Sequence, residues 1–291
     1  MKNLLLSVAS SMARVLPNSV KQCIYHIDPL ARLVRSALNR AAPTGLTEVM
    51  IAAGGAVGMK MRLDLHLEKD YWLGTYETDL QTAIDNLIEP GWRAFDVGAN
   101  IGFVSLLFAQ KLGESGKIFA FEALPANLER LRAHVEINGL DSRVRVIPAA
   151  VAATSEPVRF LVGLSGAMGK AEGSAGRTEG HRESVEVPGI CLDDFIYRDG
   201  NPPPDVIKMD IEGGEVLALK GMKRLLSETH PLILLELHGP EAARISWEIL
   251  TAAGYQICRM QRGYPPVSTF DDLDWKAYLV ARFQEQENGQ T

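Results

Sequence analysis

The pattern of apolar and polar positions predicts alternating strands and helices over most of the chain. From residue 92 onward, short apolar runs alternate with segments of helical spacing, and Gly or Pro separates them. This order is typical of an α/β fold, a doubly wound and mostly parallel sheet that ends in an antiparallel strand. The predicted strands are 92–97, 117–122, 143–149, 205–210, 232–238, 255–260 and 275–283, and the helices between them are 102–112, 125–138, 215–227 and 240–253.

The segment before this core has a different pattern. Residues 1–42 look helical and amphipathic, residues 47–67 look like β-structure, residues 70–77 look like an aromatic loop, and residues 78–88 look helical. We therefore expect an N-terminal helical extension at 1–46, a strand-and-helix lead-in at 47–91, a core domain at 92–284 and a tail at 285–291.

One internal segment is unusually rich in glycine. Residues 163–182 hold six glycines and lie between two predicted hairpin strands, 157–162 and 184–188, with a short helix expected near 191–197. A loop of this length in a compact domain is usually a lid, a binding loop or a plain linker. The sequence leaves these alternatives open.

Charge and composition restrict the partners. The chain has 291 residues and a net charge of −6, so non-specific binding to nucleic-acid phosphates is not expected. Residues 1–47 carry six basic groups against one acid. The basic extension at 1–42 either packs on the domain or makes peripheral contact with an anionic membrane surface, and no stretch has the length of a membrane span. The cysteines Cys23, Cys191 and Cys258 are too few and too scattered for a disulfide framework or a zinc site, which favours a cytoplasmic location.

The most informative motif is Ala-Phe-Asp-Val-Gly-Ala-Asn-Ile-Gly at residues 94–102, where a strand, a tight turn and a helix follow one another. Gly98 and Gly102 stand four positions apart, whereas the dinucleotide fingerprint G-x-G-x-x-G needs five. The spacing resembles the G-x-G-x-G turn of class I S-adenosylmethionine (SAM) methyltransferases. Asn100 replaces the middle glycine, and Asn tolerates the left-handed conformation well. The alternative is a tight turn that binds no ligand.

An acidic residue ends the next predicted strand. Glu122 follows Asp96 by 26 positions, and its two oxygens suit the two hydroxyl groups of an adenosine ribose. Its alternatives are a solvated side chain or a partner of the following helix dipole.

Two further strand ends carry ionisable residues. Asp210 ends the strand at 205–210 and Glu212 follows it, while Glu236 and His238 end the strand at 232–238. Because carboxyl ends of parallel strands share one sheet edge, we expect these residues to face one cleft. Asp210, Glu212 or His238 is then a candidate general base, and Asp210 with Glu236 or His238 is a candidate site for a divalent metal ion. The alternatives are a helix cap formed by Asp210 or Glu212, and a structural His238.

Together these motifs resemble those of the FkbM-type methyltransferase family over residues 70–283. The matching segments are Asp96–Gly102, Phe121-Glu122 with Pro125 and Asn127, Leu192-Asp193-Asp194, Ile207–Glu215 with Gly221, and Leu235–His238, preceded by Gly74–Glu77. One departure is Ala123-Leu124, because the family usually has Pro directly after the acid of the second strand.

The resemblance implies a Rossmann-like SAM-binding domain at 92–284 that transfers a methyl group to a hydroxyl of a sugar, glycan or polyketide-type natural product. In that interpretation Asp96, Gly98, Asn100, Gly102 and Glu122 bind SAM, and Asp210, Glu212 and His238 are the catalytic candidates. Tyr76 and Glu77 are the candidate acceptor contacts, and Tyr71, Trp72 and Tyr76 are candidates for a wall of the site.

Two alternatives of other classes remain at this point. The first is an NAD-linked oxidoreductase on the same fold class, which Glu122 also fits. The second is a non-catalytic SAM-fold module that docks through its basic N-terminus. The sequence indicates neither the acceptor nor the oligomeric state.

Overall fold

A computed structural model describes residues 11, 15, 36, 38–163, 169–172, 174 and 181–284. The predicted helical extension at 1–42 and the tail at 285–291 therefore lie almost wholly outside the described residues, and their predictions stay untested. Within the described part of the chain, no helix combines the length and the apolar character needed to cross a membrane.

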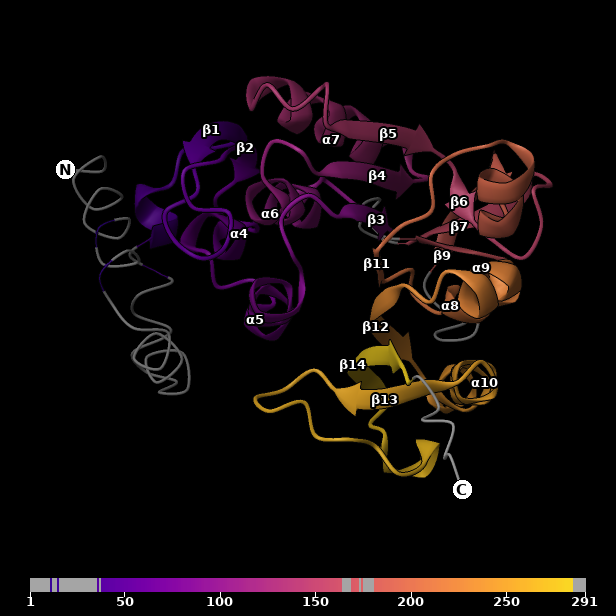
Figure 1. Ribbon diagram of the computed structural model, residues 1–291. Helices are drawn as coiled ribbons and strands as arrows, with labels where there is room; N and C mark the ends of the chain where they lie inside the picture. The colour runs from indigo at the N-terminus through magenta and orange to yellow at the C-terminus, as the bar shows by residue number, and fades with distance from the viewer. Residues whose placement is uncertain are drawn as a thin grey trace.

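A seven-stranded sheet forms the centre of the molecule (Figure 1). Its strand order is β13 (Tyr255–Arg259), β14 (Lys276–Phe283), β12 (Leu232–His238), β11 (Val206–Met209), β3 (Arg93–Val97), β4 (Lys117–Glu122) and β5 (Val144–Pro148). Only β14 runs antiparallel to its neighbours, so the predicted Rossmann-like, mostly parallel sheet with an antiparallel last strand is confirmed. The chain order reverses between β3 and β11, and ligands bind α/β sheets at such a switch point.

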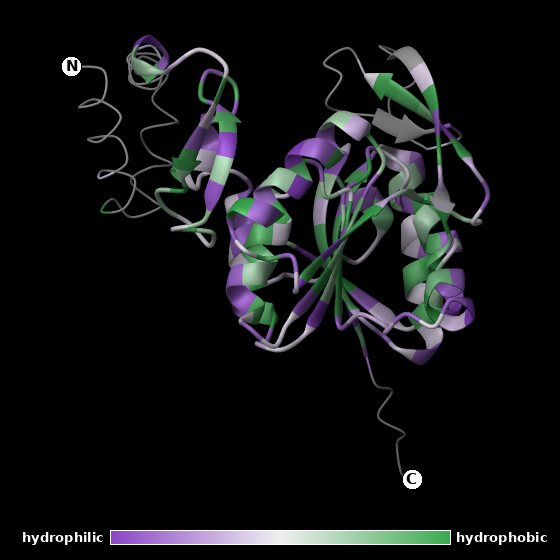
Figure 2. Cartoon of the chain, turned by 90° about the horizontal axis from the view of Figure 1, so that it is seen from above, coloured by the Kyte–Doolittle hydropathy of each residue, from purple (hydrophilic) through white to green (hydrophobic). Residues whose placement is uncertain are grey.

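Helices cover both faces of this sheet, because alternate residues of each strand point to opposite sides (Figure 2). Ala94 and Ala120 pack on one side with α5 (Thr78–Leu87), α6 (Phe103–Leu112) and α7 (Pro125–Ile137). Phe95 and Val97 pack on the other side with α8 (Glu215–Lys220), α9 (Lys223–Glu228) and α10 (Pro240–Ala252).

The helix predicted at 215–227 is two short helices in the structure. The reason is a residue far away in the sequence: the Asp193 carboxylate accepts hydrogen bonds from the backbone N–H groups of Arg224 and Leu225, each at 2.9 Å. These donors belong to the first turn of α9, so the side chain caps a new helix start where the sequence suggested continuation.

The lead-in at 47–91 packs on the core through α5, which contacts α6, and through its second strand, which contacts α7. Strands β1 (Leu46–Met50) and β2 (Lys60–Asp64) form an antiparallel pair, as the alternation within 47–67 predicts. The aromatic loop predicted at 70–77 is partly wrong, because residues 69–73 form the short helix α4 (Lys69–Leu73) and Trp72 is buried in the core. Burial of the large Trp72 side chain stabilises this helical turn, although the local sequence is typical of a loop.

A smaller sheet lies next to the carboxyl edge of the main one. The predicted hairpin is confirmed as the antiparallel pair β7 (Val158–Gly163) and β9 (His181–Val187), and β8 (Gly169–Ala171) adds a strand from within the glycine-rich segment. The role of residues 163–182 as lid or linker stays untested.

The remaining elements are the short parallel pair β6 (Ala150–Val151) and β10 (Gly189–Ile190), a π-helical turn at Asp194–Arg198 where a helix is predicted near 191–197, and a 3₁₀ turn at Phe270–Asp272. Cys191 and Cys258 are buried, free thiols.

Candidate active site

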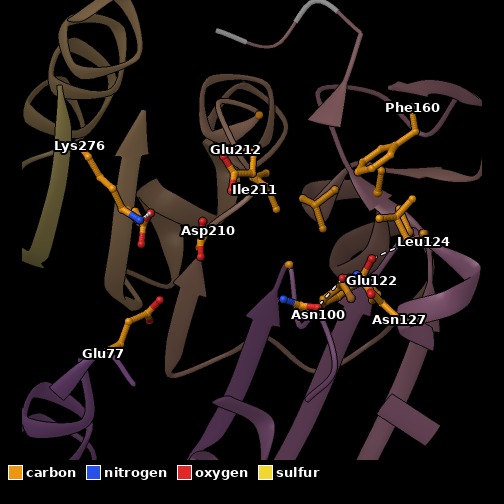
Figure 3. Close-up of a pocket in the computed structure, with 18 of the residues that line it drawn as sticks. Glu77, Asn100, Glu122, Leu124, Asn127, Phe160, Asp210, Ile211, Glu212 and Lys276 are labelled. Carbon is orange, nitrogen blue, oxygen red and sulfur yellow. Dashed lines mark hydrogen bonds and ion pairs between the residues drawn. The ribbon is translucent and has the colours of Figure 1, made fainter. Parts of the chain in front are cut away.

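A pocket opens where the chain order of the main sheet reverses, at the carboxyl ends of β3, β4, β11 and β12. Residues from the start of α5, from β14 and from the smaller sheet complete its walls (Figure 3). The lining residues are Tyr76, Glu77, Gly98, Asn100, Phe121, Glu122, Ala123, Leu124, Asn127, Ala149, Ala150, Val151, Phe160, Asp210, Ile211, Glu212, Gly214, Glu236 and Lys276.

The turn at residues 98–102 forms the floor of the pocket. Gly98 has φ 75° and Asn100 has φ 50°, so both take the left-handed conformation that the sequence suggested. A Cβ atom on Gly98 would lie 2.0 Å from the carbonyl oxygen of Asp210, because the turn presses against the end of β11. Gly102 does not line the pocket. Its φ of 94° favours glycine, and a Cβ atom there would also lie 2.5 Å from Leu131 Cδ1, so the backbone at the start of α6 accounts for this residue.

Glu122 is held at one end of the pocket by backbone donors. The Asn100 N–H donates to its Oε2 and the Leu124 N–H donates to its Oε1, both at 2.8 Å. Burial raises the pKa of Glu122, while the N–H groups and the Asn127 side chain act in the opposite direction. The Ala123 N–H is one of these donors, and a proline at that position could not supply it. These donors fix the orientation of the Glu122 carboxylate, which lines the pocket.

An apolar slot adjoins Glu122. Leu124 and Phe160 lie at the same end of the pocket as Glu122 (Figure 3), and Ala149, Ala150 and Val151 also line it. These side chains offer apolar surface beside the Glu122 carboxylate. That combination suits an aromatic ring system attached to a diol.

The opposite end of the pocket is acidic. Glu77, Asp210 and Lys276 lie there (Figure 3), and Glu212 and Glu236 contribute two further carboxylates. Burial raises the pKa of Asp210 to about 7, with Lys208 opposing the shift and the charges of Glu236 and Glu77 adding to it. A carboxylate that titrates near neutral pH is suited to accept a proton from a hydroxyl group.

Glu236 behaves differently because cations surround it. Lys276 Nζ forms an ion pair with its Oε1, and His238 Nε2 lies 2.9 Å from the same atom. Burial acts to raise the pKa of Glu236, but these two hydrogen bonds outweigh it and the pKa is lowered. Glu236 is therefore ionised, and its charge is one cause of the raised pKa of Asp210.

The geometry does not favour His238 as the general base, and its catalytic role stays a prediction. The ring does not line the pocket and is 3% exposed, with Glu236, Glu215 at 3.4 Å and Glu212 at 3.7 Å around it. Burial would lower the pKa of His238, but hydrogen bonds to Glu215 and Glu236 raise it to about 10. An imidazolium has two donors and no acceptor, so it cannot take a proton.

The segment after β11 owes its shape to Glu215. This carboxylate is fully buried, and its Oε1 accepts hydrogen bonds from the backbone N–H groups of Ile211 at 3.0 Å and Gly213 at 3.2 Å. Sequence reasoning offered Asp210 or Glu212 as the helix cap, but Glu215 holds this loop. Asp210 and Glu212 are therefore available to the pocket that they line.

Asp96 lies beneath the turn instead of in the pocket. Its side chain is fully buried, its Oδ2 accepts a hydrogen bond from Ser105 Oγ at 2.6 Å, and its Oδ1 lies 3.5 Å from Lys208 Nζ. The geometry therefore does not favour direct contact between Asp96 and a ligand. Sequence reasoning missed Lys208, although a lysine inside an apolar strand is a recognisable signal.

The predicted aromatic wall is reduced to one residue. Tyr76 lines the pocket, with its ring centroid 4.4 Å from that of Tyr71, which in turn lies 5.0 Å from Phe103. Trp72 and Tyr71 are not among the lining residues. Burial raises the pKa of Tyr71 to about 12 and raises that of Tyr76 as well, so both phenols stay protonated at neutral pH.

The carboxylates also form a candidate metal site. Glu77, Asp210 and Glu236 each offer one oxygen, and these atoms lie within 4.8 Å of one another. A second such group combines Asp210 with Glu215 and His238. Oxygen ligands suit a hard cation. However, Lys276 and His238 already neutralise part of this charge, so the metal site stays a prediction and no step below depends on it.

Comparison with known proteins gives a family match. A model of the methyltransferase FkbM domain matches residues 96–261. The hexuronic acid methyltransferase AglP of Haloferax volcanii is 30% identical over 146 residues, covering 50% of this chain and 55% of that protein. The chain thus spans about half the length of this relative. Methyltransferase sdnD of Sordaria araneosa is 26% identical over 198 residues, covering 59% of this chain and 76% of its own length.

Solved structures give a weaker likeness. Methyltransferase FkbM from Methylobacillus flagellatus KT is 18% identical with a TM-score of 0.43, and the alignment covers 89% of this chain and 60% of that one.

Proposed function

Because this chain belongs to the FkbM methyltransferase family, we propose that it transfers the methyl group of SAM to a hydroxyl group of a sugar, glycan or natural product. The observation that carries this proposal is the pairing of Glu122 with Asp210 across one pocket. Glu122 presents two oriented acceptor oxygens, and Asp210 is a carboxylate that titrates near neutral pH. Family membership favours methyl transfer over hydride transfer to NAD and over a purely docking role.

The residues of the pocket fit SAM. The two oxygens of Glu122 would accept hydrogen bonds from the ribose hydroxyls, and the slot of Leu124, Val151 and Phe160 would hold the adenine ring. The acidic end would face the sulfonium and the amino group. In this assignment Gly98 and Asn100 are the turn residues that approach the methionine part, and residues 92–284 are the SAM-binding domain.

In the proposed reaction the protein contributes mainly binding, positioning and the transfer of one proton. Bound SAM would supply a methyl group on a positively charged sulfur, which is already a good leaving group. The pocket would align the acceptor oxygen with the methyl carbon and keep water away, and such positioning is a large part of the catalytic effect. Asp210 would accept the hydroxyl proton as the new carbon–oxygen bond forms and the electron pair of the old bond passes to sulfur.

The neighbours of Asp210 explain why it is the base in this proposal. Glu236 is kept ionised by Lys276 and His238, and its negative charge helps to raise the pKa of Asp210. Glu212 lines the same wall, but its side chain is 44% exposed, so water would compete for its hydrogen bonds. Glu212 is therefore assigned to the acceptor side together with Tyr76 and Glu77.

The acceptor class follows from the same wall and from the relatives. Carboxylates accept hydrogen bonds from hydroxyl groups, so Glu77 and Glu212 suit a polyhydroxylated acceptor. The name of AglP states that it methylates a hexuronic acid, which is also a sugar. A glycan or another hydroxyl-rich small molecule is the acceptor that we propose.

Binding of the cofactor is the first test. We expect SAM and S-adenosylhomocysteine to bind the wild-type protein with a stoichiometry of one in titration calorimetry and to raise its unfolding temperature. Mass spectrometry of a panel of sugars incubated with SAM then identifies the methylated acceptor. A wild-type protein that binds neither compound would overturn the proposal.

A further inference from the structure

One buried cation has no role in the mechanism described above. Lys208 lies on β11 opposite Asp96 on β3, and only 5% of it is exposed. Lysine is rarely buried, because removing an ammonium group from water is costly unless hydrogen bonds and opposite charges replace the water. A lysine at this depth therefore indicates a defined set of partners.

These partners belong to the cofactor turn. Lys208 Nζ donates to the carbonyl oxygen of Gly98 at 2.8 Å and to that of Val97 at 3.4 Å, and it lies 3.5 Å from Asp96 Oδ1. Lys208 thus makes two hydrogen bonds and one ion pair, all with residues at the end of β3 or with the first residue of the turn.

The network continues into the helix that follows the turn. Ser105, on α6, donates to the second oxygen of Asp96 at 2.6 Å. Asp96 is thus held by Lys208 on β11 and by Ser105 on α6, and the Gly98 carbonyl is held by the same lysine. The same turn places the Asn100 N–H 2.8 Å from Glu122 Oε2. A shift of Gly98 would therefore move the donor that orients Glu122.

We propose that Lys208, together with Asp96 and Ser105, is the positioning device of the cofactor turn, which it fixes through the Gly98 carbonyl and the Asp96 carboxylate. Lys208 touches no ligand in this assignment. It acts through the turn, by keeping Gly98 and Asn100 in the left-handed conformation in which the pocket floor and the Glu122 hydrogen bond exist together. This inference rests on the proposed binding of SAM.

The positive charge of Lys208 is also stabilised by the carboxylates around it. Burial acts to lower the pKa of Lys208, but the charges of Asp96, Asp210, Glu77 and Glu236 raise it, so the ammonium stays protonated beneath the pocket. A neutral side chain of the same length would leave Asp96 without its cationic partner and the Gly98 carbonyl without this donor. We would then expect the turn at residues 98–102 to adopt other conformations as well.

The test compares three variants by titration of S-adenosylhomocysteine. Lys208→Met keeps an unbranched side chain of similar size and removes the donors, so we expect the Kd to rise by about 10-fold or more. Ser105→Ala removes one hydroxyl from Asp96, and we expect a rise of about 3-fold. Lys117→Met is the matched control, because Lys117 Nζ also donates to a carbonyl, that of Ser142 at 2.9 Å, but on the surface. Its Kd should stay within about 2-fold of the wild type.

The unfolding temperature of each ligand-free protein separates positioning from stability. A purely structural role would lower that temperature and leave the Kd of the folded protein unchanged, and this result would overturn the inference while the proposed function stands. If Lys208→Met does not fold, Ser105→Ala decides, and an unchanged Kd overturns the inference. If the wild type itself binds neither SAM nor S-adenosylhomocysteine, the proposed function and the inference both fail.

Discussion

The Nε2 atom of His238 lies 2.9 Å from the Oε1 atom of Glu236, and this pair determines how charge is distributed in the pocket. The pKa of His238 is raised to about 10, so the ring is a cation at neutral pH, and together with Lys276 it lowers the pKa of Glu236. The resulting negative charge beside Asp210 contributes to the near-neutral pKa of that residue. His238, a candidate base in the sequence, thus supports the carboxylate that we propose as the base.

The first prediction concerns the pH dependence of stability. The pKa of His238 is about 10 in the folded protein and about 6.5 in the unfolded chain. The pKa is raised by folding, so its contribution to stability is fully present below pH 6.5 and is lost as the pH rises through 10. We expect the wild type to lose free energy of unfolding between pH 7 and 10, measured by urea denaturation, and His238→Gln to lose less over the same range. Equal slopes for the two proteins would contradict this.

The second prediction concerns Asp210 as the base. Because its pKa is about 7, the turnover should rise with pH around neutrality as the carboxylate becomes ionised. Asp210→Asn should lower kcat by about 100-fold or more and leave the Kd of SAM within a few-fold of the wild type. Glu212→Gln is the matched comparison on the same wall, and we expect a smaller loss. An Asp210→Asn enzyme with full turnover would remove Asp210 from the mechanism.

The third prediction concerns Glu122. Glu122→Ala removes both acceptor oxygens at the proposed ribose site, and we expect SAM affinity to fall by about 10- to 100-fold because hydrogen bonds to a charged group are lost. Calorimetry measures this directly. Glu129→Gln is a suitable control, since Glu129 is an exposed acid on the neighbouring helix α7. If both variants bind SAM as the wild type does, Glu122 is not the ribose contact.

The fourth prediction concerns metal removal. Glu236 already has Lys276 and His238 as partners, so we expect dialysis against EDTA to leave the methyl-transfer rate unchanged. The rate is measured before dialysis, after it, and after addition of Mg²⁺. Activity that disappears with EDTA and returns with Mg²⁺ would instead assign a cation to Glu77, Asp210 and Glu236.

The fifth prediction concerns the fold. The Asp193 carboxylate caps α9 through the Arg224 and Leu225 N–H groups. Asp193→Ala should therefore lower the free energy of unfolding by about 1 kcal/mol, within the usual range for a lost helix cap. Asp199→Ala is the control, because Asp199 is exposed and its ion pair with Arg198 lies at the surface. An equal, negligible effect of both changes would show that the cap is not stabilising.

Much of the architecture followed from local pattern. Apolar periodicity predicted every strand of the main sheet to within a few residues, because the central strands β3, β4, β11 and β12 are buried on both faces and must be apolar. Topology then placed Asn100, Glu122 and Asp210 at one edge, since the carboxyl ends of parallel strands lie together. These inferences needed no knowledge of distant contacts.

The tertiary structure decided what each ionisable residue can do. His238 and Glu215 are 23 positions apart, and Lys208 and Gly98 are 110 apart, yet these contacts determine which groups are protonated and which are buried beneath the pocket. The sequence shows that an acid or a histidine stands at a strand end, but not whether the side chain faces a ligand or a neutralising partner. That distinction depends on burial and on nearby charge, which only the packing of distant segments establishes.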